Sequence, residues 1–317
     1  MPYQHVSVMP GETIDLLNCR PGKVYVDGTI GGAGHARLIL ERIVPGGLLI
    51  GMDQDAEAIE NAQVVLGSYA ENLRLFQGNF VTLPTVLSQL NLAAVDGILL
   101  DVGLSLHQLE KSGRGFSFRK DEPLDMRMDC RSGVRAADLI NSMPESDLVM
   151  ILRAYGEEPR ASRIARRIVA ERDRQPIRSS KMLADIICRA LPPKERHGRK
   201  THPATRSFMA LRIAVNKELE RLDEFLADVP RMLNPAGRIC VLTFHSLEDR
   251  IVKNRFKGFS NPCGCPKELP RCICGRKPLL QIVTRRALIP SAAEIAANPL
   301  SRSAKLRAAE KCGEQGC

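Results

Sequence analysis

Three aspartates of this chain each stand at the end of a short apolar run, where a carboxylate could do chemistry. Asp27 ends the run from residue 24, Asp53 the run from residue 47, and Asp101 the run from residue 95. Such runs predict buried strands, and ligands bind beyond the carboxyl ends of parallel strands. We expect Asp53 to bind the ribose of a nucleotide-like cofactor. We expect Asp101 to accept a hydrogen bond from the cofactor or a target amine.

A glycine-rich turn joins the first of these strands to a helix. Its glycines are Gly28, Gly31, Gly32 and Gly34, and His35 follows them. Glycines let backbone N–H groups approach a ligand, and the N-terminus of the next helix attracts negative charge. The spacing is not the G-x-G-x-x-G of dinucleotide sites, and the preceding Asp27 favours S-adenosylmethionine. The alternative is a tight strand-to-helix turn beside a solvated Asp53.

Two more residues are candidates at the same edge. Phe80 follows a third predicted strand, which starts at residue 73, and could stack on an adenine. An ordinary core aromatic fits Phe80 equally well. His245 follows a predicted strand over 238–244 and is a second candidate for catalysis, with helix capping as the alternative.

The composition suits one large domain, or a domain that carries an insertion. The chain has 317 residues, 44% of them hydrophobic, and a formal net charge of +10. The positive charge favours a polyanionic partner. Because we find neither a signal peptide nor a run of eighteen apolar residues, we expect a cytoplasmic protein with no membrane partner. The oligomeric state stays open.

The order of the predicted elements indicates an α/β fold. Strands and helices alternate up to Asp101, and strand patterns return at 238–244 and 279–284. Between Gln108 and Thr205 we find only helical and loop patterns. We therefore expect a discontinuous domain over residues 1–108 and 205–317 and an inserted all-helical domain over 109–204. One helix is expected from 202–206 through Leu226, and a turn with a short helix over 298–307.

The expected insertion is rich in basic residues. They are Arg153, Arg160, Arg163, Arg166, Arg167, Arg172, Arg174, Arg178, Lys181, Arg189, Lys194, Arg196, Arg199, Lys200 and Arg206. This density suits contact with phosphates, although a solvated helix face explains any single arginine as well. We expect this domain to recognise the substrate.

Four cysteines lie close together in a proline-rich segment. Cys263 and Cys265 form one C-x-C pair, and Cys272 and Cys274 form another. In a reducing compartment four thiolates could hold a structural zinc ion and fix a loop with few apolar residues. The spacing is tighter than in most zinc sites, so reduced or oxidation-prone cysteines are the alternative.

Several motifs together resemble one family, the bacterial 16S ribosomal RNA cytosine-N4 methyltransferases. They are DGT at 27–29 with GH at 34–35, LD at 100–101 with Gln108, RGFSF at 114–118, PLDMRM at 123–128, HPATR at 202–206, FHSLEDR at 244–250 and SRSAKLR at 301–307. The resemblance spans nearly the whole chain. It implies a Rossmann-like fold with an inserted helical domain. It also implies methyl transfer from S-adenosylmethionine to N4 of a cytidine in the decoding region of 16S rRNA, within the small ribosomal subunit.

The resemblance also implies which residues serve the reaction. The cofactor would be held by the backbone of Ala33, Gly34 and His35, and by Asp53, Phe80, Asp101 and Gln108. Ala33 stands where the family usually has glycine, which is tolerable if only its N–H is used and its φ is negative. Asp101 and His245 are the candidates for catalysis, and the reaction itself needs no metal.

Two other interpretations stay open. A methyltransferase that acts on a small molecule or a protein would share the glycine-rich turn but leave the basic insertion unexplained. A non-catalytic RNA-binding assembly factor would not depend on the cofactor.

Overall fold

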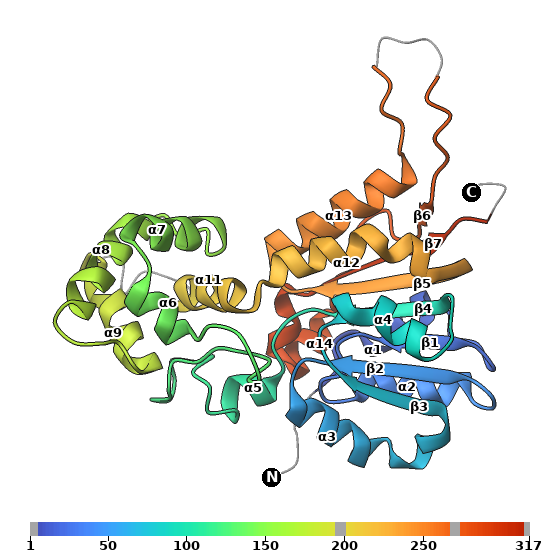
Figure 1. Ribbon diagram of the computed structural model, residues 1–317, viewed down its shortest axis with the longest axis horizontal. Coiled ribbons are helices and arrows are strands. Elements are labelled where there is room, and N and C mark those ends of the chain that lie inside the picture. The colour runs from blue at the N-terminus through green and yellow to red at the C-terminus, as the bar shows by residue number, and fades with distance from the viewer. Residues whose placement is uncertain (1–5, 194–200, 267–272, 314–317) are drawn as a thin grey trace. The chain divides into compact units, whose positions relative to one another are not determined.

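The computed structural model describes residues 6–193, 201–266 and 273–313 (Figure 1). The chain divides into two compact units, Met1–Gly103 with Leu219–Cys317 and Leu104–Glu218. The sequence placed these divisions at 108/109 and 204/205 instead. The boundary expected at 204/205 lies after Glu218 instead, because α11 (Thr205–Asn216) packs Phe208 and Leu211 into the core of the second unit.

The first unit contains a seven-stranded sheet. Its strands are β1 (Val24–Asp27), β2 (Leu48–Asp53), β3 (Leu73–Gln77), β4 (Val95–Asp101), β5 (Leu233–Thr243), β6 (Leu280–Ile282) and β7 (Lys305–Lys311). They lie in the order β3-β2-β1-β4-β5-β7-β6. Strands β1 to β5 pair in parallel, whereas β7 is antiparallel to both β5 and β6. The strand order reverses between β1 and β4, which is where sheets of this kind bind their ligands.

Helices cover both faces of this sheet (Figure 1). One face carries α1 (Pro10–Leu17), α2 (Gly34–Ile43) and α3 (Ala56–Val65), and the other carries α4 (Leu83–Gln89), α12 (Glu218–Met232) and α13 (Ser246–Ser260). Neighbouring strand residues point to opposite faces, so Tyr25 packs with the first group and Val26 with the second. This double burial explains the nearly unbroken apolar runs of the central strands. The shorter elements are η1 (Gly67–Asn72), η2 (Phe80–Thr82), α14 (Ala292–Ala297) and η3 (Pro299–Ser303).

The second unit has a core of its own, built from helices, as the sequence predicted. Besides α11, they are α5 (Leu106–Glu110), α6 (Ala136–Ser142), α7 (Glu145–Ala154), α8 (Ala161–Arg172) and α9 (Ser180–Ala190). In the described part of this unit the only strand-like pairing is a single bridge between Pro123 and Ser179. Across the described residues of both units, no helix is long and apolar enough to cross a membrane.

Two predicted elements were wrong. The single helix expected through Leu226 is two helices, because Lys217 adopts the left-handed conformation, with φ of 51°, and ends α11 before α12 begins. The short helix expected over 298–307 is η3 followed by strand β7. Leu306 of β7 pairs with Leu242 of β5, so this strand extends the sheet.

Candidate active site

Three acids lie at one edge of the sheet. Asp27 ends β1, Asp53 ends β2 and Asp101 ends β4. These strands are neighbours in the order β2-β1-β4 and run parallel. The acids therefore border the point where the strand order reverses, and the structure brings together the two carboxylates that the sequence singled out.

Burial and mutual repulsion disfavour negative charge on these acids. Burial raises the pKa of Asp27 to about 7, and the nearby Asp53 adds to this effect. Burial also raises the pKa of Asp53 to about 6. It raises the pKa of Asp101 to about 7, where the charges of Asp27 and Glu248 contribute further. Among the described residues no lysine or arginine pairs with these acids, so the edge suits a cationic ligand, such as one with sulfonium and ammonium groups.

The glycine-rich turn holds the carboxylate of Asp53 in place. Gly31 N–H donates to Oδ2 and Asp55 N–H donates to Oδ1, each at 2.9 Å. Gly31 has a φ of 44°, which glycine adopts without strain. Since a carboxylate oxygen can accept two hydrogen bonds, each oxygen keeps a further acceptor position. The ribose contact of Asp53 stays a prediction.

Two glycines of the turn lie where a Cβ would displace a neighbouring side chain. A Cβ at Gly28 would lie 2.6 Å from Leu100 Cδ2, and a Cβ at Gly34 would lie 2.0 Å from Ser7 Oγ. Gly34 is also the first residue of α2. The first N–H groups of a helix have no acceptor within the helix, so this end of α2 can offer donors to a ligand.

The backbone conformation of Ala33 differs from the predicted one. Its φ is 65° and its ψ 15°, in the left-handed region, whereas the prediction required a negative φ. Its N–H donates to the Ile30 carbonyl at 2.7 Å, so that group serves the turn itself. Left-handed alanine costs about 1 kcal/mol relative to glycine, which is a physical reason for the glycine that the resemblance implies at this position.

His35 was predicted for its backbone, but its side chain is buried beside Asp101. The His35 side chain is 5% exposed. Its Nε2 lies 3.0 Å from the Val8 carbonyl oxygen and its Nδ1 lies 3.6 Å from Asp101 Oδ2. Asp101 N–H donates to Thr29 Oγ1 at 2.6 Å and fastens the end of β4 to the turn. The imidazole therefore links the segment before α1 to the acid at the end of β4.

Phe80 and Gln108 have structural contacts of their own. The Phe80 ring is buried and packs edge to face against Phe225 of α12, with centroids 5.2 Å apart. Gln108 belongs to the second unit, where it forms a capping box with Ser105 at the start of α5. Its Oε1 accepts from Ser105 N–H, and its N–H donates to Ser105 Oγ, both at 3.1 Å. For both residues, cofactor binding stays a prediction.

His245 caps helix α13, which was the alternative considered for it. Its Nδ1 accepts from Glu248 N–H at 3.4 Å. In return, Glu248 Oε2 accepts from Phe244 N–H at 2.8 Å and His245 N–H at 3.2 Å. The His245 Nε2 lies 2.8 Å from Glu248 Oε1, in a direction that makes no hydrogen bond. Sequence reasoning missed the role of the buried Glu248. Its position three residues after the capping residue is typical of a capping box and could have indicated that role.

Asp249 connects the first turn of α13 to β7. Its Oδ2 lies 2.9 Å from Lys305 Nζ and its Oδ1 lies 2.7 Å from Arg307 Nε. Burial alone would raise the pKa of Asp249, but the hydrogen bonds from Arg307 and Lys305 outweigh it and lower that pKa. The basic residues of the SRSAKLR motif therefore fix the start of α13 against the sheet.

Three of the four clustered cysteines lie within the described residues and are close together. The Sγ atoms of Cys263, Cys265 and Cys274 all lie within 4.8 Å of one another. Cys272 falls outside the described residues. The three thiols thus have the proximity that a shared metal ion requires.

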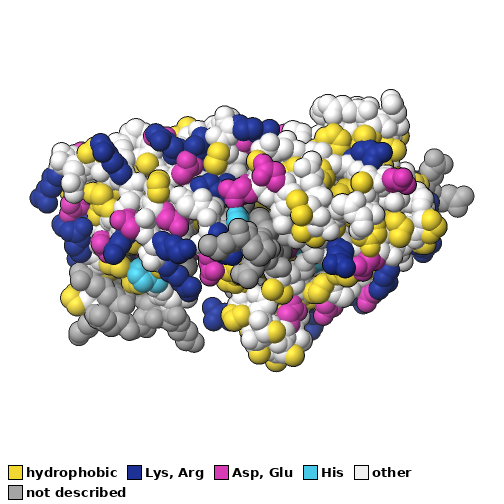
Figure 2. Space-filling view, turned by 90° about the horizontal axis from the view of Figure 1, so that it is seen from below, with side chains coloured by type: hydrophobic (Ala, Val, Ile, Leu, Met, Phe, Trp, Pro, Cys, Tyr) yellow, Lys and Arg dark blue, Asp and Glu magenta, His cyan; other side chains and the backbone are white. Residues whose placement is uncertain are grey.

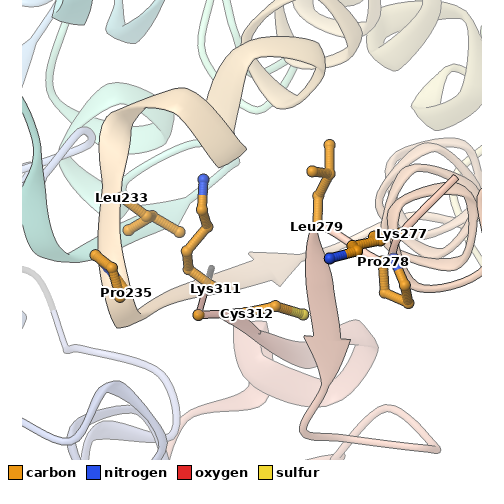
Figure 3. A pocket seen from close by; sticks show the side chains of 8 residues that line it. Leu233, Pro235, Lys277, Pro278, Leu279, Lys311 and Cys312 are labelled. Atoms are coloured by element: carbon orange, nitrogen blue, oxygen red, sulfur yellow. The ribbon is translucent and has the colours of Figure 1, made fainter. Parts of the chain in front are cut away.

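A pocket of about 390 Å³ lies at the start of β5 (Figure 3). It is lined by Leu233, Pro235, Lys277, Pro278, Leu279, Lys311, Cys312 and Gly313. Leu233 starts β5, whereas Asp101 ends the parallel neighbour β4. The pocket is therefore at the edge of the sheet opposite to the acids.

The second unit presents exposed basic side chains. Several separate lysine and arginine side chains are spread over the left side of Figure 2, where this unit lies, among acidic and apolar ones. Four exposed residues, Arg163, Arg174, Arg178 and Lys181, have no side-chain partner among the described residues. Others are engaged in the fold, such as Arg172, whose Nη1 donates to the carbonyls of Ile140 and Met143. The four exposed residues are the better candidates for phosphate contact.

The strand order with an antiparallel β7, the glycine-rich turn after β1 and the acid at the end of β2 define a Rossmann-like methyltransferase. The chain belongs to the MraW methylase family, which it matches over residues 2–312. It is 55% identical over 311 residues to a Desulfosudis oleivorans protein named ribosomal RNA small subunit methyltransferase H, covering 98% of this chain and 100% of that protein. Proteins of the same name from Desulforapulum autotrophicum and Geobacter sulfurreducens are 52% and 51% identical, over 98% of this chain and 99% and 100% of theirs.

Proposed function

We propose that this protein transfers a methyl group from S-adenosylmethionine to N4 of a cytidine in the decoding region of 16S rRNA. The substrate would be the small ribosomal subunit or a precursor of it, in the cytoplasm. The observation that carries the proposal is the identity of about half of all residues, over full length, to proteins named ribosomal RNA small subunit methyltransferase H. The buried acids and the glycine-rich turn support it.

The cofactor would lie at the acidic edge of the sheet. Asp53 would bind the ribose hydroxyls with the acceptor positions that Gly31 and Asp55 leave open. The N–H groups of Gly34 and His35, at the start of α2, would bind the cofactor's carboxylate. Phe80 would stack on the adenine, and the cofactor contact that the resemblance implies for Gln108 stays a prediction. The acids fit this cofactor because its sulfonium and ammonium groups would relieve their repulsion.

Positioning and proton removal would be the contributions of the protein to the chemistry. The cytosine N4 is a poor nucleophile because its lone pair is delocalised into the ring, and the bound cofactor supplies an activated methyl group. The site must align N4 with that methyl and accept the proton that N4 loses. Asp101 suits this task because its pKa of about 7 lies near the working pH. His245 would act by holding Glu248 and the start of α13 in place.

The second unit would bind the RNA. Its exposed Arg174, Arg178 and Lys181 have no described partner and can approach phosphates. Reversing all three to glutamate should weaken binding to small subunits and flatten its salt dependence, with cofactor affinity unchanged. Reversing Arg231, Lys253 and Lys257, which are exposed in the first unit, is the control with the same change in net charge. Equal loss in both variants would contradict a specific docking role for the second unit.

One experiment separates this proposal from the two alternatives. Titration calorimetry with S-adenosylmethionine is followed by transfer of a labelled methyl group to isolated small subunits, to free cytidine and to total protein. The proposal predicts cofactor binding and label in the 16S rRNA alone. A methyltransferase for small molecules or proteins would label the other acceptors. An assembly factor would bind subunits and transfer no label.

We also propose that the clustered cysteines bind a structural zinc ion. Cys263, Cys265 and Cys274 would supply three of its ligands, and their mutual distances support this. Protein purified without chelator should contain zinc close to one equivalent, lost in the Cys263→Ser, Cys265→Ser double variant. Cys130→Ser, which removes an exposed thiol elsewhere, should retain it. Metal-free protein of unchanged stability would refute the zinc site and leave the methyltransferase proposal standing.

A further inference from the structure

The side chain of His35 is a buried titratable group beside Asp101, and the proposed reaction does not yet use it. It projects from the first turn of α2, and its ring touches two different segments. Nε2 lies 3.0 Å from the Val8 carbonyl oxygen, and Nδ1 lies 3.6 Å from Asp101 Oδ2. The ring is nearly inaccessible to water, so both of its nitrogens depend on partners within the protein.

The contact with Val8 determines which ring nitrogen carries the proton. A carbonyl oxygen only accepts hydrogen bonds, so Nε2 must be the donor and keep its hydrogen. In the neutral ring, Nδ1 is then an acceptor, and it faces the carboxyl group of Asp101. Two acceptors facing each other repel, whereas one proton between them makes a hydrogen bond. The separation of 3.6 Å is slightly longer than such a bond, and a small movement closes it.

We propose that His35 and Asp101 form the proton-accepting pair of the reaction, with His35 as the positioning residue. This inference rests on the proposed methyl transfer. As N4 bonds to the methyl carbon, the bond from that carbon to the sulfonium sulfur would break, and its electron pair would stay on the sulfur, leaving S-adenosylhomocysteine. The N4–H bond would break as well, and its proton would pass to Asp101 and form an O–H bond there. The new carboxylic acid then donates to Nδ1 of His35. His35 thereby stabilises the protonated product state of Asp101 and makes it a stronger base than an isolated carboxylate.

The other groups around Asp101 act in the same direction. Asp27 on β1 and Glu248 on α13 are the acids that face it, and both disfavour its ionised form. Thr29 Oγ1 accepts from its backbone N–H and holds the strand end, not the carboxylate. Among the described residues His35 is therefore the neighbour whose lone pair can receive the Asp101 proton. Its loss should lower the basicity of Asp101, although burial and the two acids remain.

The first test needs no substrate. Histidine-labelled, cofactor-free protein is titrated and the ¹⁵N shifts of the His35 ring are followed by NMR. We expect the Nε2–H form, and an Nδ1 shift that changes near pH 7 as Asp101 gains its proton. That change should disappear in Asp101→Asn. An Nδ1–H form, or a ring that does not respond to Asp101, would overturn the proposal.

The second test is the pH dependence of single-turnover methyl transfer to small subunits by His35→Gln. The glutamine amide can still donate to Val8, but it offers no imidazole lone pair to Asp101. We expect a plateau rate lower by about tenfold and a midpoint moved to lower pH by about one pH unit, with cofactor affinity retained. A lower rate with an unmoved midpoint would show a purely structural role. If the wild type transfers no methyl group, the proposed function fails. The NMR titration still tests whether His35 responds to the protonation of Asp101.

Discussion

Replacing Asp53 by alanine should weaken cofactor binding more than any other single change at the β2 end. Gly31 and Asp55 each use one acceptor position of the carboxylate, so about two positions remain for the two ribose hydroxyls. A hydrogen bond to a charged group contributes about 1.5–3 kcal/mol. Two such bonds, partly replaced by water in the variant, correspond to a loss of about 3 kcal/mol. This is an increase in Kd of about 100-fold.

The asparagine variant makes this prediction sharper. An amide has one acceptor oxygen, so its NH₂ group would face the N–H of either Gly31 or Asp55. Asp53→Asn should therefore bind the cofactor no better than Asp53→Ala, despite its similar shape. In the wild type, affinity should fall as pH drops below about 6, where Asp53 becomes protonated. Both variants should lose this part of the pH dependence.

Titration calorimetry with S-adenosylmethionine at pH 5.5 and 7.5 checks these expectations. The control is Glu60→Ala, which removes an exposed acid from the neighbouring helix α3 and should not change Kd. An Asp53→Ala protein with an affinity within twofold of the wild type would remove Asp53 from the site. An Asp53→Asn protein with wild-type affinity would refute the hydrogen-bond count.

Three further changes should alter stability, each read from chemical denaturation of the cofactor-free protein. Asp27→Asn should stabilise the protein, because the raised pKa of Asp27 means that the wild type loses folding stability as pH rises from about 4 to 7. The gain in unfolding free energy over the wild type should reach about 2–4 kcal/mol at pH 8 and vanish near pH 4. Ala33→Gly should raise stability by up to about 1 kcal/mol, since it relieves the left-handed alanine, and no gain would argue against that backbone conformation. Asp249→Asn should lower the unfolding free energy by about 2–3 kcal/mol at pH 7, because it weakens the contacts with Lys305 and Arg307. Since the pKa of Asp249 is lowered in the folded protein, this loss should shrink as pH falls below about 4. A loss that does not depend on pH would contradict the ion pairing.

The sequence was sufficient to predict the edge where the acids meet. Asp53 and Asp101 end apolar runs, and the parallel pairing of buried strands brings such ends together. The helical insertion was visible because strand patterns stop after Asp101. These features depend on local pattern and on general rules of sheet topology.

Strand β7 was missed because its pattern is not that of a buried strand. Its sequence, KLRAAEK, is rich in residues that favour helices. Its Leu306 is buried by pairing with β5, while Arg307 is satisfied by Asp249. Tertiary pairing therefore overrides local preference there. The break at Lys217 was hidden for a related reason, since lysine gives no local sign of a left-handed residue.

The roles of the two histidines also required the structure. His245 could cap a helix or serve the reaction, and the reciprocal bonds with Glu248 show that it caps α13. The His35 ring lies between Val8 and Asp101, which are 93 positions apart in the sequence, as their numbers show. Side-chain geometry of this kind depends on how the turn and two strand ends pack, and residue spacing does not contain it.

The central claim is methylation of one cytidine in 16S rRNA, and mass mapping of modified nucleosides tests it directly. The rRNA is taken from cells with the protein, from cells without it, and from cells that carry Asp53→Ala. We predict one N4-methylated cytidine of the decoding region in the first sample, which loses that methyl group in the second and is depleted in the third. An unchanged set of cytidine modifications in all three samples would contradict the account.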